Sequence, residues 1–227
     1  MLRALYSSAS GMESQQMNLD VIANNLANVN TTGFKKAKIE FQDLLYQTKR
    51  AAGAESGPGT QVPTSLQIGH GARPVSTAKI FTAGEIMSTG ERLDLAIHGN
   101  GFFKVTLADG TNAFTRDGGF KLDSTGQIVT SDGLPVTSFA GVTISPEATN
   151  VSISQTGIVS VTQNGTTSTA GSLVLSRFAN SAGLENIGAN LYRETPASGT
   201  EQTGEPSNAG MGTVHQGYLE LSNVKVV

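Results

Sequence analysis

The sequence has no cysteine and no tryptophan among its 227 residues. The lack of cysteine excludes disulfides, thiolate nucleophiles and cysteine-ligated zinc, and it leaves the redox compartment open. No run of apolar residues is longer than three. We therefore expect neither membrane insertion nor a cleaved signal peptide, so a chain of this kind would leave the cytoplasm by another route.

Charge is also scarce, with charged residues at 15% of the chain against about 25% in typical domains. The 15 Lys and Arg residues are outnumbered by 18 Asp and Glu. Such a chain has no positive field that could hold a phosphate backbone, so nucleic acid is not an expected partner. Glycine is abundant at 27 residues, which favours strands joined by tight turns.

The first 33 residues predict a long α-helix. Up to about Asn30 they contain no proline and one glycine, and apolar or small side chains recur at alternating steps of three and four. This period of 3.5 is typical of a coiled-coil seam, which needs another helix to cover it. We expect Gly33 to end the helix, because glycine tolerates left-handed geometry. The predicted seam consists of Leu2, Leu5, Ala9, Met12, Gln16, Leu19, Ala23 and Leu26.

The opposite face of this helix carries hydroxyl and amide side chains in place of the usual Glu and Lys pairs. Such groups cost little to desolvate when they are hydrogen-bonded, so this face is predicted to suit contacts with other subunits. The nearby lysines 35, 36 and 38 are interpreted as a solvated face. The polar face consists of Ser7, Ser8, Ser10, Ser14, Gln15, Asn18, Asn24, Asn25 and Asn28.

The rest of the chain predicts β structure. Residues 34–65 form a connecting segment of undecided type with a Gly-rich linker at 51–59, and residues 66–213 form a β domain. Residues 194–212 are expected to be an extended surface segment, and 214–227 a return segment. Six turn dipeptides predict antiparallel hairpins: Asp109-Gly110, Gly118-Gly119, Thr125-Gly126, Asp132-Gly133, Thr156-Gly157 and Asn164-Gly165. The fold class is mainly β, with a long N-terminal helix of coiled-coil type and an irregular antiparallel sandwich or barrel.

The sequence shows no catalytic chemistry. The three histidines His70, His98 and His215 are far apart along the chain and lack a second ligand at metal spacing. Most aspartates of the β region stand beside turn glycines, where Asp is common for backbone reasons. The Gly99-to-Gly101 stretch lacks the rest of a phosphate loop and predicts a tight turn into a strand. We expect no catalytic residues, no cofactor and no metal.

Several stretches resemble the flagellar basal-body rod and hook family. The run from Ala4 to Lys36, with ANNLANVNTTGFK at its centre, is the most specific, and LDLAIHGNGFFKV and GYLELSNV also fit. The pairing of DLLYQ with QIGHGARPV is most similar to the distal-rod branch, with proximal rod and hook subunits as the nearest alternatives. The motif positions are Asn24, Asn25, Leu26, Ala27, Asn28, Val29, Asn30, Thr31, Gly33, Phe34, Gly99, Gly101, Phe102, Phe103, Ser222, Asn223 and Val224.

The resemblance implies a structural protein, not an enzyme. Its members polymerise helically into a hollow tube in the periplasm, with the N-terminal helix in the inner layer and a β domain outside, and the tube transmits torque and passes exported subunits. The implied partners are further copies of the chain, proximal rod and hook proteins, surrounding ring proteins and the flagellar type III export apparatus, which exports subunits without a cleaved signal.

The resemblance also implies a long C-terminal helix after the Ser-Asn-Val motif, whereas this sequence stops at Val227, either truncated or without that tail. Lys225 stands where Asp or Asn is expected. Two other classes stay open. A secreted β-rich carbohydrate-active enzyme or binding domain would need a cleft with two carboxylates about 5 to 9 Å apart, and a fibre subunit or adhesin would exchange strands between copies.

Overall fold

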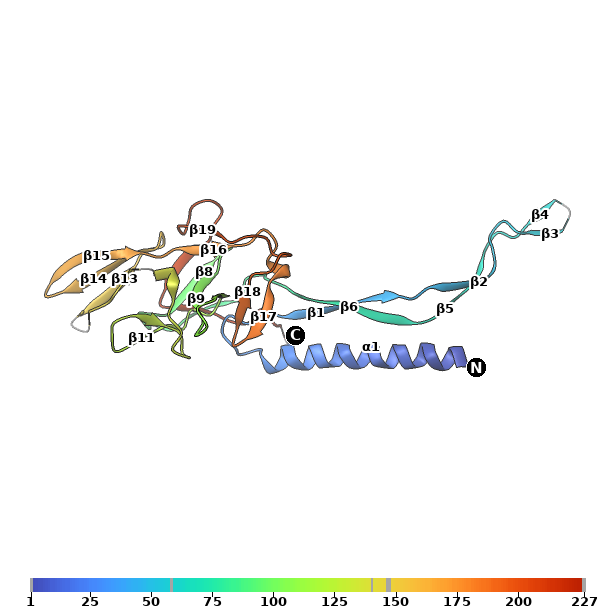
Figure 1. Ribbon diagram of the computed structural model, residues 1–227, viewed down its shortest axis with the longest axis horizontal. Coiled ribbons are helices and arrows are strands. Elements are labelled where there is room, and N and C mark those ends of the chain that lie inside the picture. Colours follow the sequence, from blue (N-terminus) through green and yellow to red (C-terminus); the bar gives the residue numbers. More distant parts are fainter. Residues whose placement is uncertain (1, 58, 140, 146–147, 226–227) are drawn as a thin grey trace. The chain divides into compact units, whose positions relative to one another are not determined.

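The computed structural model describes residues 2–57, 59–139, 141–145 and 148–225 (Figure 1). The chain forms two compact units. Unit 1 comprises Met1–Asn25 and Ala37–Ala78, and unit 2 comprises Leu26–Lys36 and Lys79–Val227. This grouping differs from the predicted boundaries at residues 33 and 65, because the segment after the helix pairs with a strand that the sequence had assigned to the β domain.

The predicted N-terminal helix is present as α1 (Leu2–Ala27). The expectation that Gly33 ends it is wrong, because the helix stops at Ala27 and residues 28–33 form turns, with the Thr31 N–H donated to the Asn28 carbonyl at 3.2 Å. Gly33 has a φ of +67°, but a Cβ there would lie 2.5 Å from the backbone nitrogen of Asp117. Glycine is therefore needed at this position for close packing as well as for backbone conformation.

Beside α1, unit 1 contains a long antiparallel hairpin in which each outer pair of strands encloses the next. The linker expected at 51–59 lies inside this hairpin, where β3 and β4 pair near its tip, and the undecided segment after residue 34 is a strand. The bounds, from the outer pair to the inner one, are β1 (Ala37–Asp43) with β6 (Ala72–Lys79), β2 (Tyr46–Arg50) with β5 (Leu66–Gly69), and β3 (Glu55–Gly57) with β4 (Thr60–Gln61).

The polar face of α1 lies against this hairpin. A Cβ at Gly71 would lie 2.1 Å from the hydroxyl of Ser10, so helix and hairpin approach more closely than a larger residue would permit. Asn25 donates to and accepts from the backbone of Ala37, at 2.8 and 2.9 Å, and Ser14 is buried. The expectation that this face meets other subunits therefore needs correction, because part of it is covered by the chain's own strands.

Unit 2 consists of small antiparallel sheets. The largest has the order β17-β18-β10-β9 and the next the order β13-β14-β15, while β8 pairs with β20, β7 with β21, β16 with β19 and β11 with β12. The bounds are β7 (Ile86–Ser88), β8 (Leu95–His98), β9 (Phe103–Thr106), β10 (Asn112–Thr115), β11 (Lys121–Leu122), β12 (Ile128–Val129), β13 (Asn150–Ile153), β14 (Ile158–Gln163), β15 (Thr166–Ser172), β16 (Leu175–Arg177), β17 (Glu185–Gly188), β18 (Leu191–Arg193), β19 (Gln202–Gly204), β20 (Thr213–Gln216) and β21 (Tyr218–Glu220), with 3-10 turns at Thr137–Phe139 and Ser181–Gly183.

The mainly β prediction with a long N-terminal helix is confirmed, and most predicted turns join paired strands. Asp109-Gly110 joins β9 to β10, Thr125-Gly126 joins β11 to β12, and Asn164-Gly165 joins β14 to β15. Gly118-Gly119 joins no such pair, and Asp132-Gly133 is followed only by an isolated bridge from Pro135 to Val129 among the described residues. A Cβ at Gly118 would lie 1.7 Å from the Leu95 carbonyl, so this glycine allows two segments to touch and makes no hairpin.

The core of unit 2 has a mainly aliphatic part, which also holds Phe103, Phe120 and Phe139, and a smaller aromatic part. The aliphatic part includes Leu95, Val105 and Leu173, all almost completely buried, and the aromatic part is built around Phe102, Phe114 and Phe178. The expectation of a surface segment at 194–212 is partly wrong. This stretch contains β19, a fully buried Ser198 and a buried Met211.

The close packing at Gly33 predicts a steric effect that exceeds backbone strain. Gly133 also has a positive φ, but a Cβ there meets nothing within 4 Å. We expect Gly133→Ala to destabilise the fold by about 1–2 kcal/mol through backbone strain alone. Gly33→Ala should cost about 1–3 kcal/mol more through overpacking. Chemical denaturation of both variants measures the difference, and equal losses would contradict the contact with Asp117.

Candidate functional site

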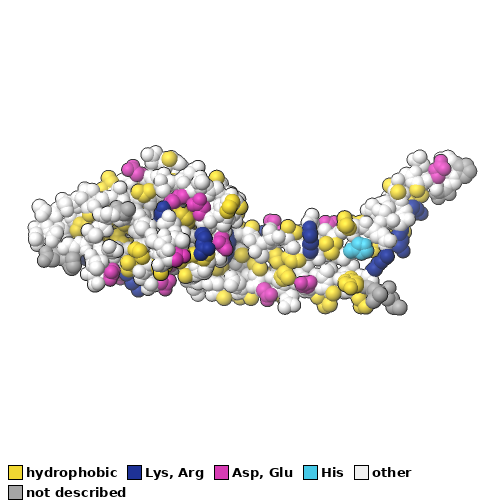
Figure 2. Space-filling model, viewed as in Figure 1, with side chains coloured by type: hydrophobic (Ala, Val, Ile, Leu, Met, Phe, Trp, Pro, Cys, Tyr) yellow, Lys and Arg dark blue, Asp and Glu magenta, His cyan; other side chains and the backbone are white. Residues whose placement is uncertain are grey.

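The predicted seam of α1 is exposed. Leu5, Met12, Leu19 and Leu26 show 66%, 69%, 64% and 53% of their surface. Ala9, Gln16 and Ala23 are exposed as well, and the side chain of Leu2 lies outside the described residues. Figure 2 shows hydrophobic side chains gathered along α1. Part of the polar face is turned to the hairpin, whereas this apolar row is left exposed.

In unit 2, motif residues from distant parts of the sequence meet at one point. Asn223 accepts the backbone N–H of Lys36 at 2.7 Å and donates its amide to the Ile80 carbonyl at 2.7 Å. Gly33 donates its N–H to the Glu220 carbonyl at 2.8 Å. Hydrogen bonds thus join the segment that follows α1 to the last described residues, and join those residues to the stretch before β7.

A buried ion network lies at this point. The Nζ atom of Lys35 lies 2.5 Å from one carboxylate oxygen of Glu220, and Nη1 of Arg116 lies 3.5 Å from the other. The side chains of Lys35, Glu220 and Arg116 are 0%, 1% and 3% exposed. The interpretation of Lys35 as a solvated lysine is therefore wrong, whereas Lys36 is half-buried and Lys38 is exposed. We name Lys35, Arg116 and Glu220 the ion triad.

Neighbouring polar groups complete the bonding of the ion triad. Lys35 also donates to the Thr82 carbonyl at 2.8 Å, and Glu220 accepts the Gly84 N–H at 2.9 Å. Arg116 donates to the Gly99 carbonyl at 2.6 Å and lies over the ring of Phe102. Burial lowers the pKa of Lys35 and of Arg116, and the charge of Glu220 opposes that shift in both.

The other motif residues fall into two groups. Gly99, with a φ of +114°, and Gly101 form the expected turn between β8 and β9, while Phe34, Phe102, Phe103 and Ser222 are buried. Val29, Asn28, Thr31 and Val224 are half-buried, whereas Asn24, Ala27 and Asn30 are exposed. Several motif residues are thus buried in unit 2, and others lie on its surface or on α1.

Two features of the structure bear on catalytic chemistry. Pairing of β8 with β20 brings the rings of His98 and His215 to a centroid distance of 6.0 Å, although the two residues are far apart along the chain. Among the residues that the structure describes, no group of three potential metal ligands occurs.

Within the same residues, no helix is long and apolar enough to cross a membrane.

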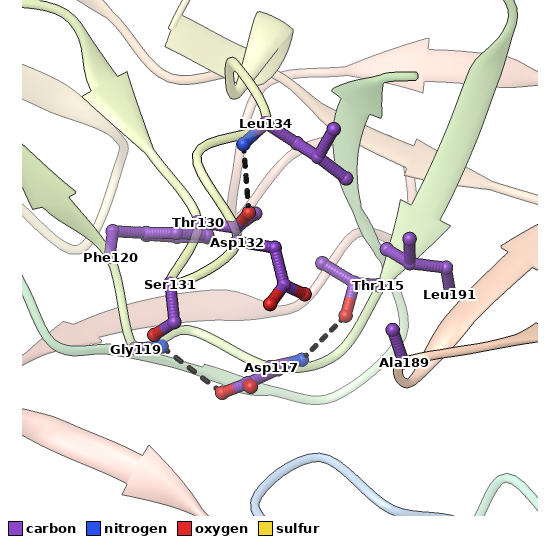
Figure 3. Close-up of a pocket in the computed structure, with 10 residues that line it drawn as sticks. All are labelled: Thr115, Asp117, Gly119, Phe120, Thr130, Ser131, Asp132, Leu134, Ala189 and Leu191. Carbon is purple, nitrogen blue, oxygen red and sulfur yellow. Dashed lines mark hydrogen bonds between the residues drawn. The ribbon is translucent and has the colours of Figure 1, made fainter. Parts of the chain in front are cut away.

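Figure 3 shows a small pocket lined by two carboxylates, Asp117 and Asp132. Asp117 accepts the N–H of Gly119 at 3.1 Å, and burial raises its pKa. The cavity has a volume of about 40 Å³, which is room for a few water molecules and not for a sugar ring. This pocket therefore gives no support to the carbohydrate-active alternative.

Comparison with known proteins shows the family. The flagella basal body rod protein family matches residues 5–35, and the flagellar hook protein FlgE/F/G D1 domain matches residues 96–161. The flagellar basal-body rod protein FlgG of Buchnera aphidicola subsp. Schizaphis graminum is 48% identical over 228 residues, covering 100% of this chain and 87% of the relative. The chain belongs to the flagellar basal-body rod protein family.

A second relative of this rod protein, FlgG of Borreliella burgdorferi, is 48% identical over 230 residues, with 100% of this chain and 86% of the relative covered. The flagellar hook protein FlgE of Helicobacter pylori is 45% identical over 137 residues, covering 60% of this chain and 19% of the hook protein. This rod protein is a structural subunit of the distal rod and belongs to the flagellar basal body assembly, in a family not known for enzymatic activity.

The ion triad predicts that Lys35 is critical for stability, whereas Lys38 in the same segment is not. Lys35→Met leaves the buried carboxylate of Glu220 with Arg116, at 3.5 Å, as its cationic partner, and removing one member of a buried pair costs about 3–5 kcal/mol. Lys38→Met changes an exposed lysine in the same segment and should cost less than about 0.5 kcal/mol. Urea unfolding compares the variants, and a similar small loss in both would show that the ion triad does not hold this region.

The buried carboxylate of Asp117 predicts a pH effect. Because the pKa of Asp117 is raised in the folded protein, folding favours the protonated carboxyl. The stability that this protonated form contributes is lost as the pH rises above 3.8 and through the folded pKa. The stability of Asp117→Asn relative to the natural protein should therefore increase between pH 3 and pH 7.

Asp109 provides the control of opposite sign. Hydrogen bonds from the Thr111 hydroxyl and N–H lower its pKa, so its contribution is lost as the pH falls through the folded pKa. Asp109→Asn should lose stability relative to the natural protein as the pH rises over the same range. Thermal unfolding at several pH values tests both, and equal pH slopes would contradict the assignment.

Proposed function

We propose that this rod protein polymerises helically into a hollow shaft through the seam of α1. The observation that carries the proposal is the exposed row of Leu5, Met12, Leu19 and Leu26 along a helix whose other face is partly covered by the hairpin. Isolated helices in water are marginal, and four large apolar side chains at heptad spacing match what another helix would bury. The seam is therefore the surface that joins subunits in the inner layer.

The remaining parts of the proposal follow from family resemblance and from the sequence. Unit 2 forms the outer layer, and lateral contacts between copies set the stiffness with which torque is transmitted. Proximal rod and hook proteins are the axial partners, ring proteins surround the shaft, and the export apparatus delivers subunits through its channel into the periplasm without a cleaved signal. The residues that we expect to carry this function are those of the seam and of the family motif.

The seam predicts that one charge blocks assembly. Leu19→Asp places a carboxylate in the middle of the apolar row, where burying an unpaired charge is costly. We expect polymer formation to be lost while the fold of unit 2 is unchanged. Gln15→Asp adds the same charge at an exposed position outside the seam and should assemble like the natural protein.

Electron microscopy and light scattering of concentrated protein measure polymer formation, and circular dichroism checks the fold. Normal polymers from Leu19→Asp would refute the role of the seam. Loss of polymers in both variants would point to a general effect of charge on α1, which is also against the proposal.

A further inference from the structure

An open pocket in unit 2 has a lining that combines positive charge with aromatic rings. It lies between the turn that follows β8 and the residues at the end of β16, and it has a volume of about 250 Å³. The polar part of the lining consists of Arg116, Arg177, Asn100 and Ser181, and the aromatic part consists of Phe81, Phe102 and Phe178. No residue of the ion triad other than Arg116 is in the lining, so the pocket opens beside the triad and not through it.

The positive charge of this pocket is not balanced by its own lining, which holds two guanidinium groups and no carboxylate. Among the described residues, Arg116 forms an ion pair with Glu220, whose carboxylate lies closer to Lys35, at 2.5 Å against 3.5 Å. Within the described part of the chain Arg177 takes part in no ion pair, and its Nη1 donates to the Ala209 carbonyl at 3.4 Å. The positive charge of Arg116 and Arg177 is therefore only partly balanced, by a carboxylate that is also paired with Lys35.

A second observation concerns the side chain of Arg116 itself. It is 3% exposed, its Nη1 and Nη2 donate to the Ile97 and Gly99 carbonyls, and its Nε has no hydrogen-bond partner among the described residues. This Nε–H is itself buried, so it cannot reach a ligand in the pocket, and Arg116 adds its charge to the site without a hydrogen bond from Nε. Guanidinium groups match the paired oxygens of carboxylates, sulfates and phosphates.

We infer that this pocket binds an oxyanion, held by the guanidinium of Arg177 and the nearby charge of Arg116, with the Asn100 amide and the Ser181 hydroxyl as neutral donors. The oxyanion has two possible sources. One is a free small anion, and the other is the carboxylate of an Asp or Glu side chain from a second copy in the polymer. The second source rests on the proposed function, whereas the binding chemistry does not.

Sulfate is the probe for the binding chemistry. It is titrated into the full chain at constant ionic strength, with chloride as the balancing salt, and the melting temperature and amide NMR shifts are recorded. We expect a saturable rise in melting temperature, with shifts around Asn100 and Ser181. Arg177→Gln removes one charged donor at the half-buried edge and should weaken sulfate binding about tenfold.

Arg92→Gln is the matched control, because Arg92 is likewise an arginine of unit 2 that donates to a backbone carbonyl, that of Thr149, and forms no ion pair among the described residues. It should bind sulfate as the natural protein does. A response to sulfate no larger than that to chloride, or an equal response in Arg177→Gln, would overturn the inference.

A second arm separates the two sources once binding is established. If the occupant is a carboxylate from another copy, saturating sulfate should suppress polymer formation by the natural protein, and Arg177→Gln should polymerise poorly without sulfate. If the occupant is a free anion, both should polymerise normally. Because sulfate binding is measured on the unpolymerised protein, failure of the seam proposal leaves this result intact.

Discussion

The ion triad of Lys35, Arg116 and Glu220 is the constraint on which unit 2 depends. Taking three charges out of water is expensive, and the cost is offset only if every charge keeps a partner at the right distance. Glu220 is separated along the chain from Lys35 by 185 positions and from Arg116 by 104. Correct placement of the triad therefore requires that the segment after α1, the middle of the β region and the last strand are all in position together.

The neighbouring glycines and amides follow from this requirement. Gly33 has to be glycine because the segment that carries Lys35 lies against the backbone of Arg116 and Asp117. The side-chain amide of Asn223 forms hydrogen bonds with the backbone of Lys36 and of Ile80. These bonds hold the same segment after α1 that the ion triad holds through Lys35. In the proposed polymer, force on the segment after α1 would pass into the β sheets through these bonds.

In unit 1, by contrast, large apolar side chains of the helix are left exposed. Its helix places Ser10 and Ser14 against its own hairpin and leaves the apolar heptad positions, among them Met12 and Leu19, in contact with solvent. Small hydroxyls permit close approach to Gly71, whereas the larger apolar side chains find no cover within the described unit. Unit 2 is thus held by its own buried polar groups, whereas unit 1 leaves an apolar face that the proposed assembly would cover.

Much of this arrangement could be predicted from local patterns in the sequence. The heptad steps identify α1, and turn pairs such as Asn164-Gly165 identify hairpins, because both signals depend on neighbours within a few residues. The burial of Lys35 could not be predicted, since a lysine next to Lys36 and near Lys38 looks solvated until Glu220 is known to lie beside it. The meeting of His98 with His215 depends in the same way on the pairing of β8 with β20.

Hydrogen–deuterium exchange of the full chain, free and polymerised, tests the account most directly. In the free protein, the amides of Gly33, Lys36 and Gly84 should exchange only with global unfolding of unit 2, while α1 exchanges much faster. In the polymer, α1 should become protected and these three amides should not change. Fast exchange at Lys36 and Gly84 in the free protein, or an α1 equally labile in both states, would contradict it.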